Sequence, residues 1–232
     1  MISIVTSLYK SEQHLPVFLE SARTVHKDLK KEDIAFQHLI IANDISETEK
    51  SLLENSKLTF TVITVERESL YASWNRGVHE GVYPNATFWA VDDTRFAKAI
   101  IKGLKTLENG YDATYFPYIY KRYMYIFGIK ILALIKIVNP LDYNKELFMV
   151  GMYAGPHFIF KKESFQKIGP FDDSYKIAGD FDWWARAAKS DLKLKKTSTL
   201  SGVFTNNGKT LSGSKSDLQN EENARVVTEN NS

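Results

Sequence analysis

The sequence predicts an α/β fold with a mostly parallel central sheet flanked by helices. Over residues 1–110, apolar runs alternate with helical patterns. The runs are apolar on both faces, as in parallel strands that helices cover from both sides. The composition, 44% hydrophobic and 25% charged over 232 residues, is that of an ordinary folded protein. A chain of this size buries roughly 70% of its unfolded surface and needs no disulfide.

The first elements are marked by an apolar run and a helical stripe. Ile2 to Leu8 is rich in β-branched residues and predicts a buried strand. The stripe that follows predicts one face of an amphipathic helix; its residues are Leu15, Phe18, Leu19, Ala22, Val25 and Leu29. His38 to Ala42 predicts the second strand. Ser46 precedes Glu49 by three residues, a capping-box pattern that opens a short helix.

The same alternation continues to residue 110. Phe60 to Val65 and Thr87 to Val91 predict the third and fourth strands. Between them, Leu70, Trp74 and Val78 recur every four residues and predict a helix. A last stripe predicts another helix, formed by Phe96, Ala99, Ile100, Gly103, Leu104 and Leu107. Strands joined through helices imply parallel pairing, because such crossovers return the chain to the same end of the sheet.

The second half of the chain is less regular. His157 to Phe160 predicts a strand, and Asp180 to Lys189 predicts a helix. Residues 206–232 are polar and predict a flexible tail, or a loop that orders on binding. We therefore expect a single domain over 1–232, with an aromatic-rich, irregular stretch at 112–150 and this polar segment at its end.

Tyr123 to Val138 is the longest apolar stretch, interrupted by Lys130 and Lys136. It is short for a membrane span and carries charge. We interpret it as an amphipathic helix, either buried in the protein or lying on a membrane, where residues 121–138 would make peripheral contact with anionic lipid. Both interpretations assume that the stretch is helical.

Composition and motifs exclude several classes of function. The net charge of +2 does not indicate nucleic-acid binding. The absence of cysteine excludes disulfides, zinc–thiolate sites and cysteine nucleophiles. No glycine-rich phosphate loop of the Rossmann or P-loop kind is present. The N-terminus has no basic region before its apolar run, so we expect no cleaved signal peptide and a cytoplasmic protein.

Polar residues follow the strands at the edge where α/β sheets bind ligands. Asp92 and Asp93 follow the fourth strand, and adjacent carboxylates repel unless a cation or protons separate them. Mg²⁺ or Mn²⁺ would resolve the repulsion, although a solvated turn that caps the next helix is the alternative. Asp44 follows the second strand and could accept hydrogen bonds from a base or ribose, or form an Asx-turn.

Asp180 to Arg186 is the densest chemical patch. Asp180 or Asp182 could act as a general base, and the two tryptophans between Asp182 and Arg186 could stack on a sugar. Acidic residues are also favoured at a helix start by the dipole alone, and the tryptophans could belong to the core. His157 could be an ordinary half-buried histidine or could contact phosphate or a metal.

Taken in order, four segments resemble family 2 glycosyltransferases, inverting enzymes with the GT-A fold. These segments are Ile2–Ser7, Ile41–Ser46, Leu70–Val78 followed by Trp89–Asp93, and Phe160–Arg186. The resemblance covers about residues 1–225 and is weakest over 112–150. Two departures occur: Ile45 stands where a glycine is usual, and Gly179 stands where a glutamate is usual before the base.

The resemblance implies roles for individual residues. Thr6, Tyr9 and Asp44 would contact the base and ribose of a nucleotide-sugar, with Arg67 as a weaker candidate. Asp92 would face the ribose or the metal, and Asp93 would bind the metal, Mg²⁺ or Mn²⁺. Asp180 would be the catalytic base, and Gly179 leaves room for Asp182 as partner or rival. Residues 1–110 would then bind the nucleotide-sugar and residues 111–205 the acceptor.

The resemblance implies transfer of a sugar from a nucleotide-sugar, foremost a UDP-sugar, to a hydroxyl of a glycan or lipid-linked acceptor, as in bacterial polysaccharide biosynthesis. A loop over Asn206–Asp217, with Gly208 and Gly213 as hinges, could close over the donor. A nucleotidyltransferase is disfavoured, because no glycine-rich loop follows the first strand. The alternative that stays open is a non-catalytic nucleotide-sugar-binding or scaffold protein on the same fold.

Overall fold

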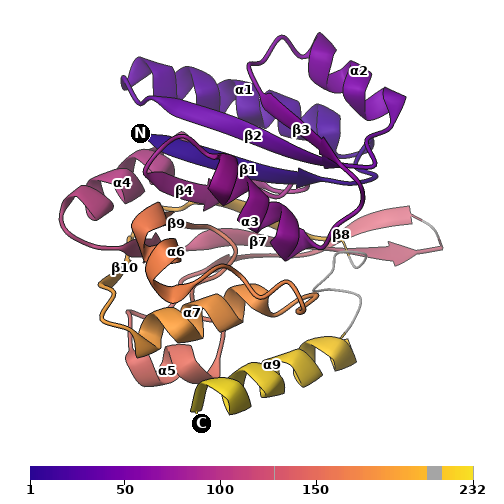
Figure 1. The fold of residues 1–232 in the computed structure, drawn as a ribbon. Coiled ribbons are helices and arrows are strands. Elements are labelled where there is room, and N and C mark those ends of the chain that lie inside the picture. The colour runs from indigo at the N-terminus through magenta and orange to yellow at the C-terminus, as the bar shows by residue number, and fades with distance from the viewer. Residues whose placement is uncertain (128, 208–215, 232) are drawn as a thin grey trace.

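A computed structural model describes residues 1–127, 129–207 and 216–231 (Figure 1). Its central sheet has seven strands: β1 (Ile2–Leu8), β2 (Phe36–Asn43), β3 (Thr61–Val65), β4 (Asn85–Phe88), β6 (Ala113–Tyr115), β9 (Phe158–Lys161) and β10 (Leu194–Lys196). Their spatial order is β10-β6-β9-β4-β1-β2-β3. All neighbouring pairs are parallel except those of β9, which runs antiparallel to β4 and β6. The predicted mostly parallel sheet is confirmed.

Helices cover both faces of this sheet. One face packs against α1 (Leu15–Lys31), α2 (Glu47–Asn55) and α4 (Ala97–Glu108). The other packs against α3 (Leu70–Glu80), α5 (Lys145–Val150), α6 (Lys162–Ile168), α7 (Gly179–Lys189) and α9 (Ser216–Asn231). Burial on both faces explains why the strands are apolar throughout: along β1, Ile2 and Ile4 face one core and Val5 the other.

Most elements of the first half form where the sequence predicts them. The capping box of α2 is present, because the Ser46 hydroxyl accepts from the Glu49 amide and the Glu49 carboxylate accepts from the Ser46 amide, both at 3.1 Å. The fourth strand ends at Phe88 rather than at Val91. The chain turns there, since the Asp93 amide donates to the Ala90 carbonyl at 3.1 Å. This turn takes the two aspartates out of the sheet.

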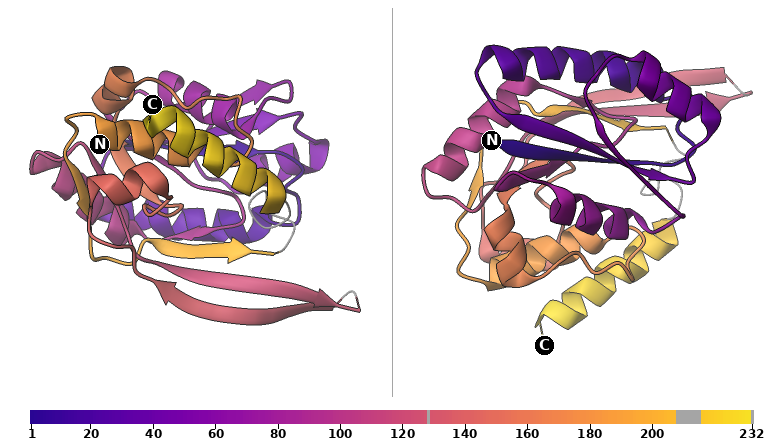
Figure 2. Two further views of the ribbon diagram at one scale, coloured as in Figure 1. Left: turned by 90° about the horizontal axis from the view of Figure 1, so that it is seen from below. Right: turned by 45° about the horizontal axis from the view of Figure 1, so that its top comes forward.

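A second sheet corrects the helix expected at Tyr123–Val138. Its strands are β5 (Thr94–Arg95), β11 (Gly202–Asn206), β7 (Tyr118–Ile126) and β8 (Ile129–Val138), in the order β5-β11-β7-β8. β7 and β8 form an antiparallel hairpin that projects from the body (Figure 2). Isoleucines at alternate positions of β8 fit a pleated strand. The helix prediction weighed apolar content and missed this period of two.

The polar segment at the end of the chain also differs from the expected tail. Residues Ser216–Asn231 form α9, which packs on α5 and α7. Val226 is fully buried in this contact, and the partly buried Val227 packs against the same core, so two valines and several polar contacts dock a helix with a polar composition. The expected hinges Gly208 and Gly213 lie outside the described residues. No helix in the described part of the chain is both long and apolar enough to cross a membrane.

Candidate active site

Loops after three neighbouring strands meet at the carboxyl edge of the central sheet. The Arg67 guanidinium, after β3, lies 4.5 Å from the centre of the Tyr9 ring, after β1. Asp44, after β2, is exposed, and its amide donates to the Val65 carbonyl at 3.0 Å. Tyr9, Asp44 and Arg67 are therefore brought to one edge of the sheet, as predicted from their positions after strands.

A buried amide that the sequence analysis did not single out supports this edge. The Asn43 side chain donates to the Ser73 hydroxyl at 3.1 Å and accepts from the Glu68 amide at 2.9 Å. It thereby joins the end of β2 to the start of α3 and fixes the loop that carries Arg67. The only sequence signal was an asparagine next to the more conspicuous Asp44.

Asp93 lies inside the protein, 4% exposed. Its Oδ1 accepts from the Thr205 amide at 2.9 Å, and its Oδ2 lies 3.3 Å from His157 Nε2. Burial raises the pKa of Asp93 to about 7, although the amide of Thr205 and the charge of Arg95 act in the opposite direction. Asp93 thus ties the turn after β4 to β11 and to the segment before β9.

Asp92 is only partly buried and lies at the edge. Burial, and then the charge of Asp93, raise the pKa of Asp92 to about 6. His14, after β1, and Lys130, in β8, act in the opposite direction. A residue after β1 and a residue of β8 therefore both lower the pKa of this carboxylate, and His14 was not predicted from the sequence.

The aspartate pair fits a divalent cation that a substrate would help to hold. Among the described residues, no three His, Asp or Glu side chains are grouped closely enough to hold a metal alone. Mg²⁺ and Mn²⁺ commonly take one or two carboxylates and complete their shell with substrate phosphates and water. Both Asp93 oxygens already have partners. This arrangement favours Asp92 as the metal ligand. The sequence analysis expected Asp93 in that role.

Asp180 begins α7 and is held by one of its two oxygens. Oδ1 accepts from the Phe181 amide at 2.9 Å and lies 3.3 Å from the hydroxyl of Tyr71, in α3. In the described part of the chain, no hydrogen bond reaches Oδ2. Burial raises the pKa of Asp180 to about 6. This carboxylate is oriented on one side and available on the other.

Glu222 of α9 fixes the segment just before Asp180. Its carboxylate accepts from the amides of Lys176, Ile177 and Ala178 at 2.8–2.9 Å. The same segment is contacted by the Tyr71 hydroxyl, 2.6 Å from the Ile177 carbonyl. A carboxylate at the start of α7 also complements the helix dipole. Nothing in the sequence pointed to Glu222, which lay in the expected tail.

Thr6 does not reach this edge with its side chain. Its hydroxyl is fully buried, donates to the Trp89 carbonyl at 2.8 Å and lies 3.0 Å from His38 Nε2. These bonds direct Thr6 toward the α1 face of the sheet. Its expected contact with a nucleotide is therefore not supported by its position.

Three residues of the acidic patch and His157 have structural surroundings. Asp182 pairs with Arg186 at 2.7 Å and is 6% exposed, so its carboxylate is engaged within the fold. Trp183 and Trp184 are fully buried, so they belong to the core rather than to a sugar platform. His157 is buried between Asp93 and the hydroxyl of Ser201, at 2.9 Å from the latter.

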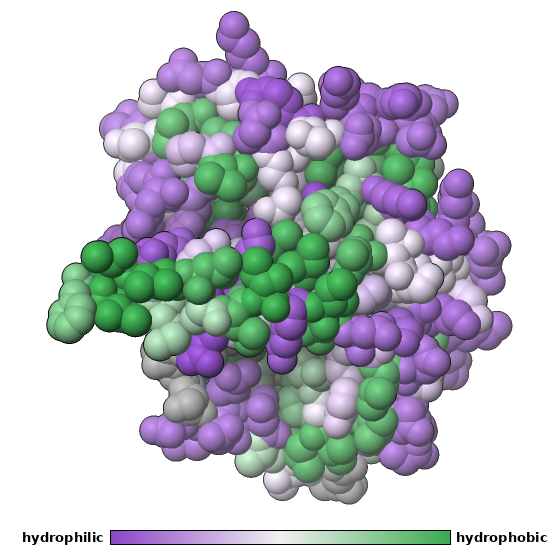
Figure 3. Space-filling model, turned by 180° about the vertical axis from the view of Figure 1, so that it is seen from behind, coloured by the Kyte–Doolittle hydropathy of each residue, from purple (hydrophilic) through white to green (hydrophobic). Residues whose placement is uncertain are grey.

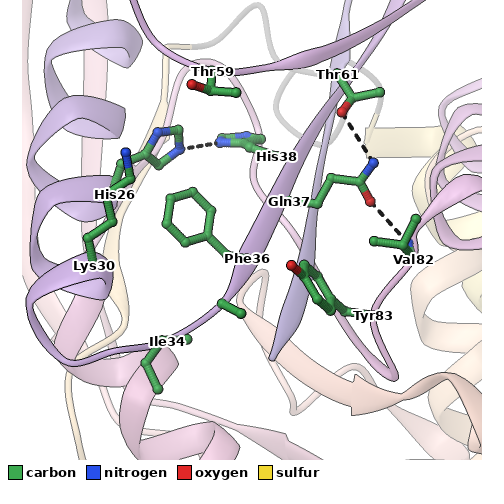
Figure 4. A pocket seen from close by; sticks show the side chains of 11 residues that line it. His26, Lys30, Ile34, Phe36, Gln37, His38, Thr59, Thr61, Val82 and Tyr83 are labelled. Atoms are coloured by element: carbon green, nitrogen blue, oxygen red, sulfur yellow. Dashed lines mark hydrogen bonds between the residues drawn. The ribbon is translucent and has the colours of Figure 1, made fainter.

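A cavity of about 480 Å³ lies at the opposite edge of the sheet (Figure 4). The amino-terminal ends of β2 and β3 line it, together with α1. His26 Nε2 lies 2.9 Å from His38 Nδ1 beside it. None of the residues predicted from the sequence as site residues lines this cavity.

Solved structures resemble the whole of this fold. S. aureus TarS 1–349 in complex with UDP matches with a TM-score of 0.66 at 13% identity, over 99% of this chain and 64% of that chain. The complex of TarS 1–349 with UDP-GlcNAc matches with a TM-score of 0.64 at 13% identity, over 91% and 60%. The mannosyltransferase PcManGT from Pyrobaculum calidifontis, in complex with GDP-Man and Mn²⁺, matches with a TM-score of 0.61 at 11% identity, over 88% and 56%.

These similarities show the fold, and they confirm the predicted GT-A architecture. This chain spans less than two thirds of the length of the TarS fragment. No family model matches the chain, and no curated protein matches it in sequence.

Proposed function

We propose that this chain is an inverting, nucleotide-sugar-dependent glycosyltransferase of family 2. The observation that carries the proposal is Asp180, a carboxylate with one oxygen fixed and the other without a partner among the described residues. It begins a helix held to α3 near the carboxyl edge of a GT-A sheet. Structural neighbours with this fold were solved with UDP, UDP-GlcNAc or GDP-Man, which supports a nucleotide-sugar as the donor.

The donor nucleotide would bind across the ends of β1, β2 and β3. The Arg67 guanidinium lies 4.5 Å from the centre of the Tyr9 ring, and a base could stack on this pair. Asp44 is exposed beside them and can accept hydrogen bonds from ribose hydroxyls or a base N–H. A UDP-sugar is our first candidate.

The diphosphate would lie against Asp92. Asp92, backed by Asp93, would hold Mg²⁺ or Mn²⁺ together with the phosphates. The ion would neutralise charge on the departing diphosphate. His14 adds to the positive surroundings of Asp92 when protonated.

Asp180 would act as the general base. Its free oxygen would accept the proton of an acceptor hydroxyl while that oxygen bonds to the anomeric carbon. The bond from this carbon to the diphosphate breaks on the opposite face, so the configuration inverts. With a pKa of about 6, Asp180 is ionised at neutral pH and basic enough to share the proton in the transition state. Tyr71 and Glu222 position it.

Donor binding and turnover test this proposal separately. UDP-, GDP- and dTDP-sugars are added with Mn²⁺, and both the melting temperature and the release of nucleoside diphosphate are measured. We expect one donor class to raise the melting temperature and to be hydrolysed slowly. Asp180→Asn should keep the thermal shift and lose roughly 10²–10⁴-fold in turnover, and Asp92→Asn should lose both.

Asp173→Asn is the matched control, because Asp173 is an exposed carboxylate in the segment before α7. It should behave like the wild type. A donor that raises the melting temperature without any turnover, in the presence of simple glycan and lipid-linked acceptors, would support the non-catalytic binding protein instead. No thermal shift with any nucleotide-sugar would reject both functions.

A further inference from the structure

The end of the β7–β8 hairpin exposes an apolar surface that the fold itself does not cover. We call residues 123–127 and 129–132 the apolar tip. Phe127 is 100% exposed and Ile129 66%. Exposed with them are Met124, Tyr125, Ile126, Ile131 and Leu132. Figure 3 shows hydrophobic residues gathered along the projecting hairpin. Monomeric soluble proteins rarely expose contiguous apolar surface of this kind without a partner.

The tip is apolar on both faces. Met124 pairs with Ile131 and Ile126 with Ile129, while Tyr123 pairs with Leu132. Because neighbouring residues of a strand point to opposite faces, these pairs lie on the two sides of the hairpin. A globular partner that packs on one face would leave the other in water. A medium that surrounds the tip would cover both.

Positive charges lie behind the tip. Lys121 and Arg122 in β7, and Lys136 in β8, form what we call the basic collar. Lys136 pairs with Tyr120, so the collar is about five to seven residues from Phe127 along the hairpin. At ~3.3 Å per residue, the collar is roughly 17–23 Å behind the end of the hairpin. No acidic residue occurs between Asp112 and Asp142. The collar therefore meets the apolar tip without any compensating negative charge in this segment.

Lys130 lies within the tip, but its charge is directed backward. Its ammonium group is 4.3 Å from the centre of the Tyr123 ring, which lies further from the end of the hairpin. This is the arrangement called snorkelling, in which the stem covers apolar surface and the charge leaves it. Tyr120 adds an aromatic ring at the level of the basic collar, and Tyr123 and Tyr125 add rings between the collar and the end of the hairpin. Aromatic rings are typical of residues at a membrane interface.

We propose that the β7–β8 hairpin docks the protein on an anionic lipid bilayer. The apolar tip enters the interfacial region, and the basic collar meets lipid phosphates. β8 is the outer strand of its sheet, so one row of its N–H and C=O groups would be costly in the hydrocarbon core. Insertion is therefore shallow, where water and headgroups reach these groups. Pairing with a second copy would bring two basic collars together.

Docking would turn the candidate active site toward the lipid. The hairpin extends past the edge of the sheet at which β1 ends (Figure 1), and the charge of Lys130 acts on Asp92. A docked protein would meet an acceptor whose hydroxyl lies at the bilayer surface, as in a lipid-linked glycan. This consequence rests on the proposed function, whereas the docking itself does not.

Vesicle flotation tests the docking without any sugar donor. The probes are vesicles of phosphatidylcholine alone and of phosphatidylcholine mixed with phosphatidylglycerol. We expect wild type to float with the anionic vesicles. The triple variant Lys121→Gln/Arg122→Gln/Lys136→Gln should weaken binding to the anionic vesicles by roughly 100-fold, which is about tenfold or less for each charge removed. Ile126→Ser/Phe127→Ser should weaken binding to both kinds of vesicle at least roughly tenfold.

Val17→Ser/Val82→Ser is the matched control, since these valines are 70% and 71% exposed elsewhere on the surface. It should float like the wild type. The natural absence of cysteine also allows a single fluorophore to be placed at Phe127→Cys or at Val82→Cys. Anionic vesicles should shift the emission to the blue at position 127 only.

Three results would overturn the proposal. The first is a wild type that does not float with anionic vesicles, and the second is a tip variant that floats as well as the control. The third is a wild-type oligomer, detected by light scattering, that Ile126→Ser/Phe127→Ser disperses, which would assign the tip to a second copy of the chain. Melting curves of all variants establish that the loss of flotation is not a loss of folding. Donor binding measured on the same samples separates this outcome from a failure of the proposed function.

Discussion

The strands of the first half and the β7–β8 hairpin are built from the same residues in opposite surroundings. Ile2, Ile4 and Ile40 are fully buried in the central sheet. Ile129 and Ile137, in β8, are 66% and 64% exposed. Both regions carry long apolar runs, so apolar content alone does not distinguish them. What differs is the partner: helices cover the first region, and nothing within the described chain covers the hairpin tip.

An apolar run therefore indicates that a segment needs a covering surface. It does not indicate which surface covers the segment. In the central sheet the chain supplies that surface, because β1, β2 and β3 are each followed by a helix with its own apolar face. In the hairpin, β7 turns directly into β8, and no helix follows to cover it.

The largest effect is expected for Phe158→Ala in the central sheet. Phe158 is 1% exposed and packs against Phe88, Trp183 and Trp184. Removing its ring leaves a cavity among aromatic side chains that cannot close, so the free energy of unfolding should fall by about 3–5 kcal/mol. Urea denaturation measures this. A loss below about 1 kcal/mol would mean that this cluster is far looser than its packing indicates.

The sequence predicted the first half well because local pattern and burial agree there. The run at Ile2–Leu8 and the stripe from Leu15 to Leu29 were both found at their expected places. The edge residues Asp44 and Asp92 followed from one general rule about strands. Their positions needed no knowledge of distant contacts.

The rest could not be predicted because it depends on contacts far apart in the chain. Thr6 was expected to contact the nucleotide, but His38 and Trp89 hold its hydroxyl on the α1 face of the sheet. Glu222 was placed in a tail, yet it binds three amides more than forty residues away. Asp93 was expected to bind the metal, but Thr205 and His157 lie against its oxygens.

The second largest effect is expected for Glu222→Ala, which tests a long-range contact. Three buried or partly buried amides would lose a charged acceptor, and we expect the free energy of unfolding to fall by about 2–3 kcal/mol. Hydrogen exchange at Ile177 and Ala178 should become faster. Glu221→Ala is the control, because Glu221 is an exposed neighbour on the same helix. If Glu222→Ala and Glu221→Ala have the same free energy of unfolding and the same hydrogen exchange, then Glu222 does not position Asp180.

Asp180→Asn should change the free energy of unfolding by a smaller amount, and should raise it rather than lower it. Burial raises the pKa of Asp180 from 3.8 to about 6, so the folded state binds a proton more tightly than the unfolded state. The free energy of unfolding therefore falls as the pH rises from about 4 to about 6. At pH 7 the variant should be more stable by about 1–2 kcal/mol, less than the full shift implies because the carboxylate is partly exposed.

The same pKa predicts that transfer by the wild type is lost as the pH falls through about 6, since a protonated base accepts no proton. Denaturation at pH 4 and at pH 7 measures the free energy of unfolding of wild type and of Asp180→Asn. Asp173→Asn is the control, and its difference from wild type should be the same at both pH values. A variant that is less stable than wild type at pH 7 would show that the charge of Asp180 supports the fold. The site would then impose no cost in stability.

The smallest effect is expected for Phe127→Ser in buffer, and it is the sharpest contrast with Phe158→Ala. The Phe127 side chain is as exposed in the folded protein as in the unfolded chain, so the free energy of unfolding should change by less than about 0.5 kcal/mol. With anionic vesicles, wild type should gain stability, because the bilayer binds the folded hairpin and shifts the equilibrium by mass action. Phe127→Ser should gain less. If it instead loses more than about 1 kcal/mol in buffer, the tip is already covered by protein in solution, and its partner is part of this chain or a second copy.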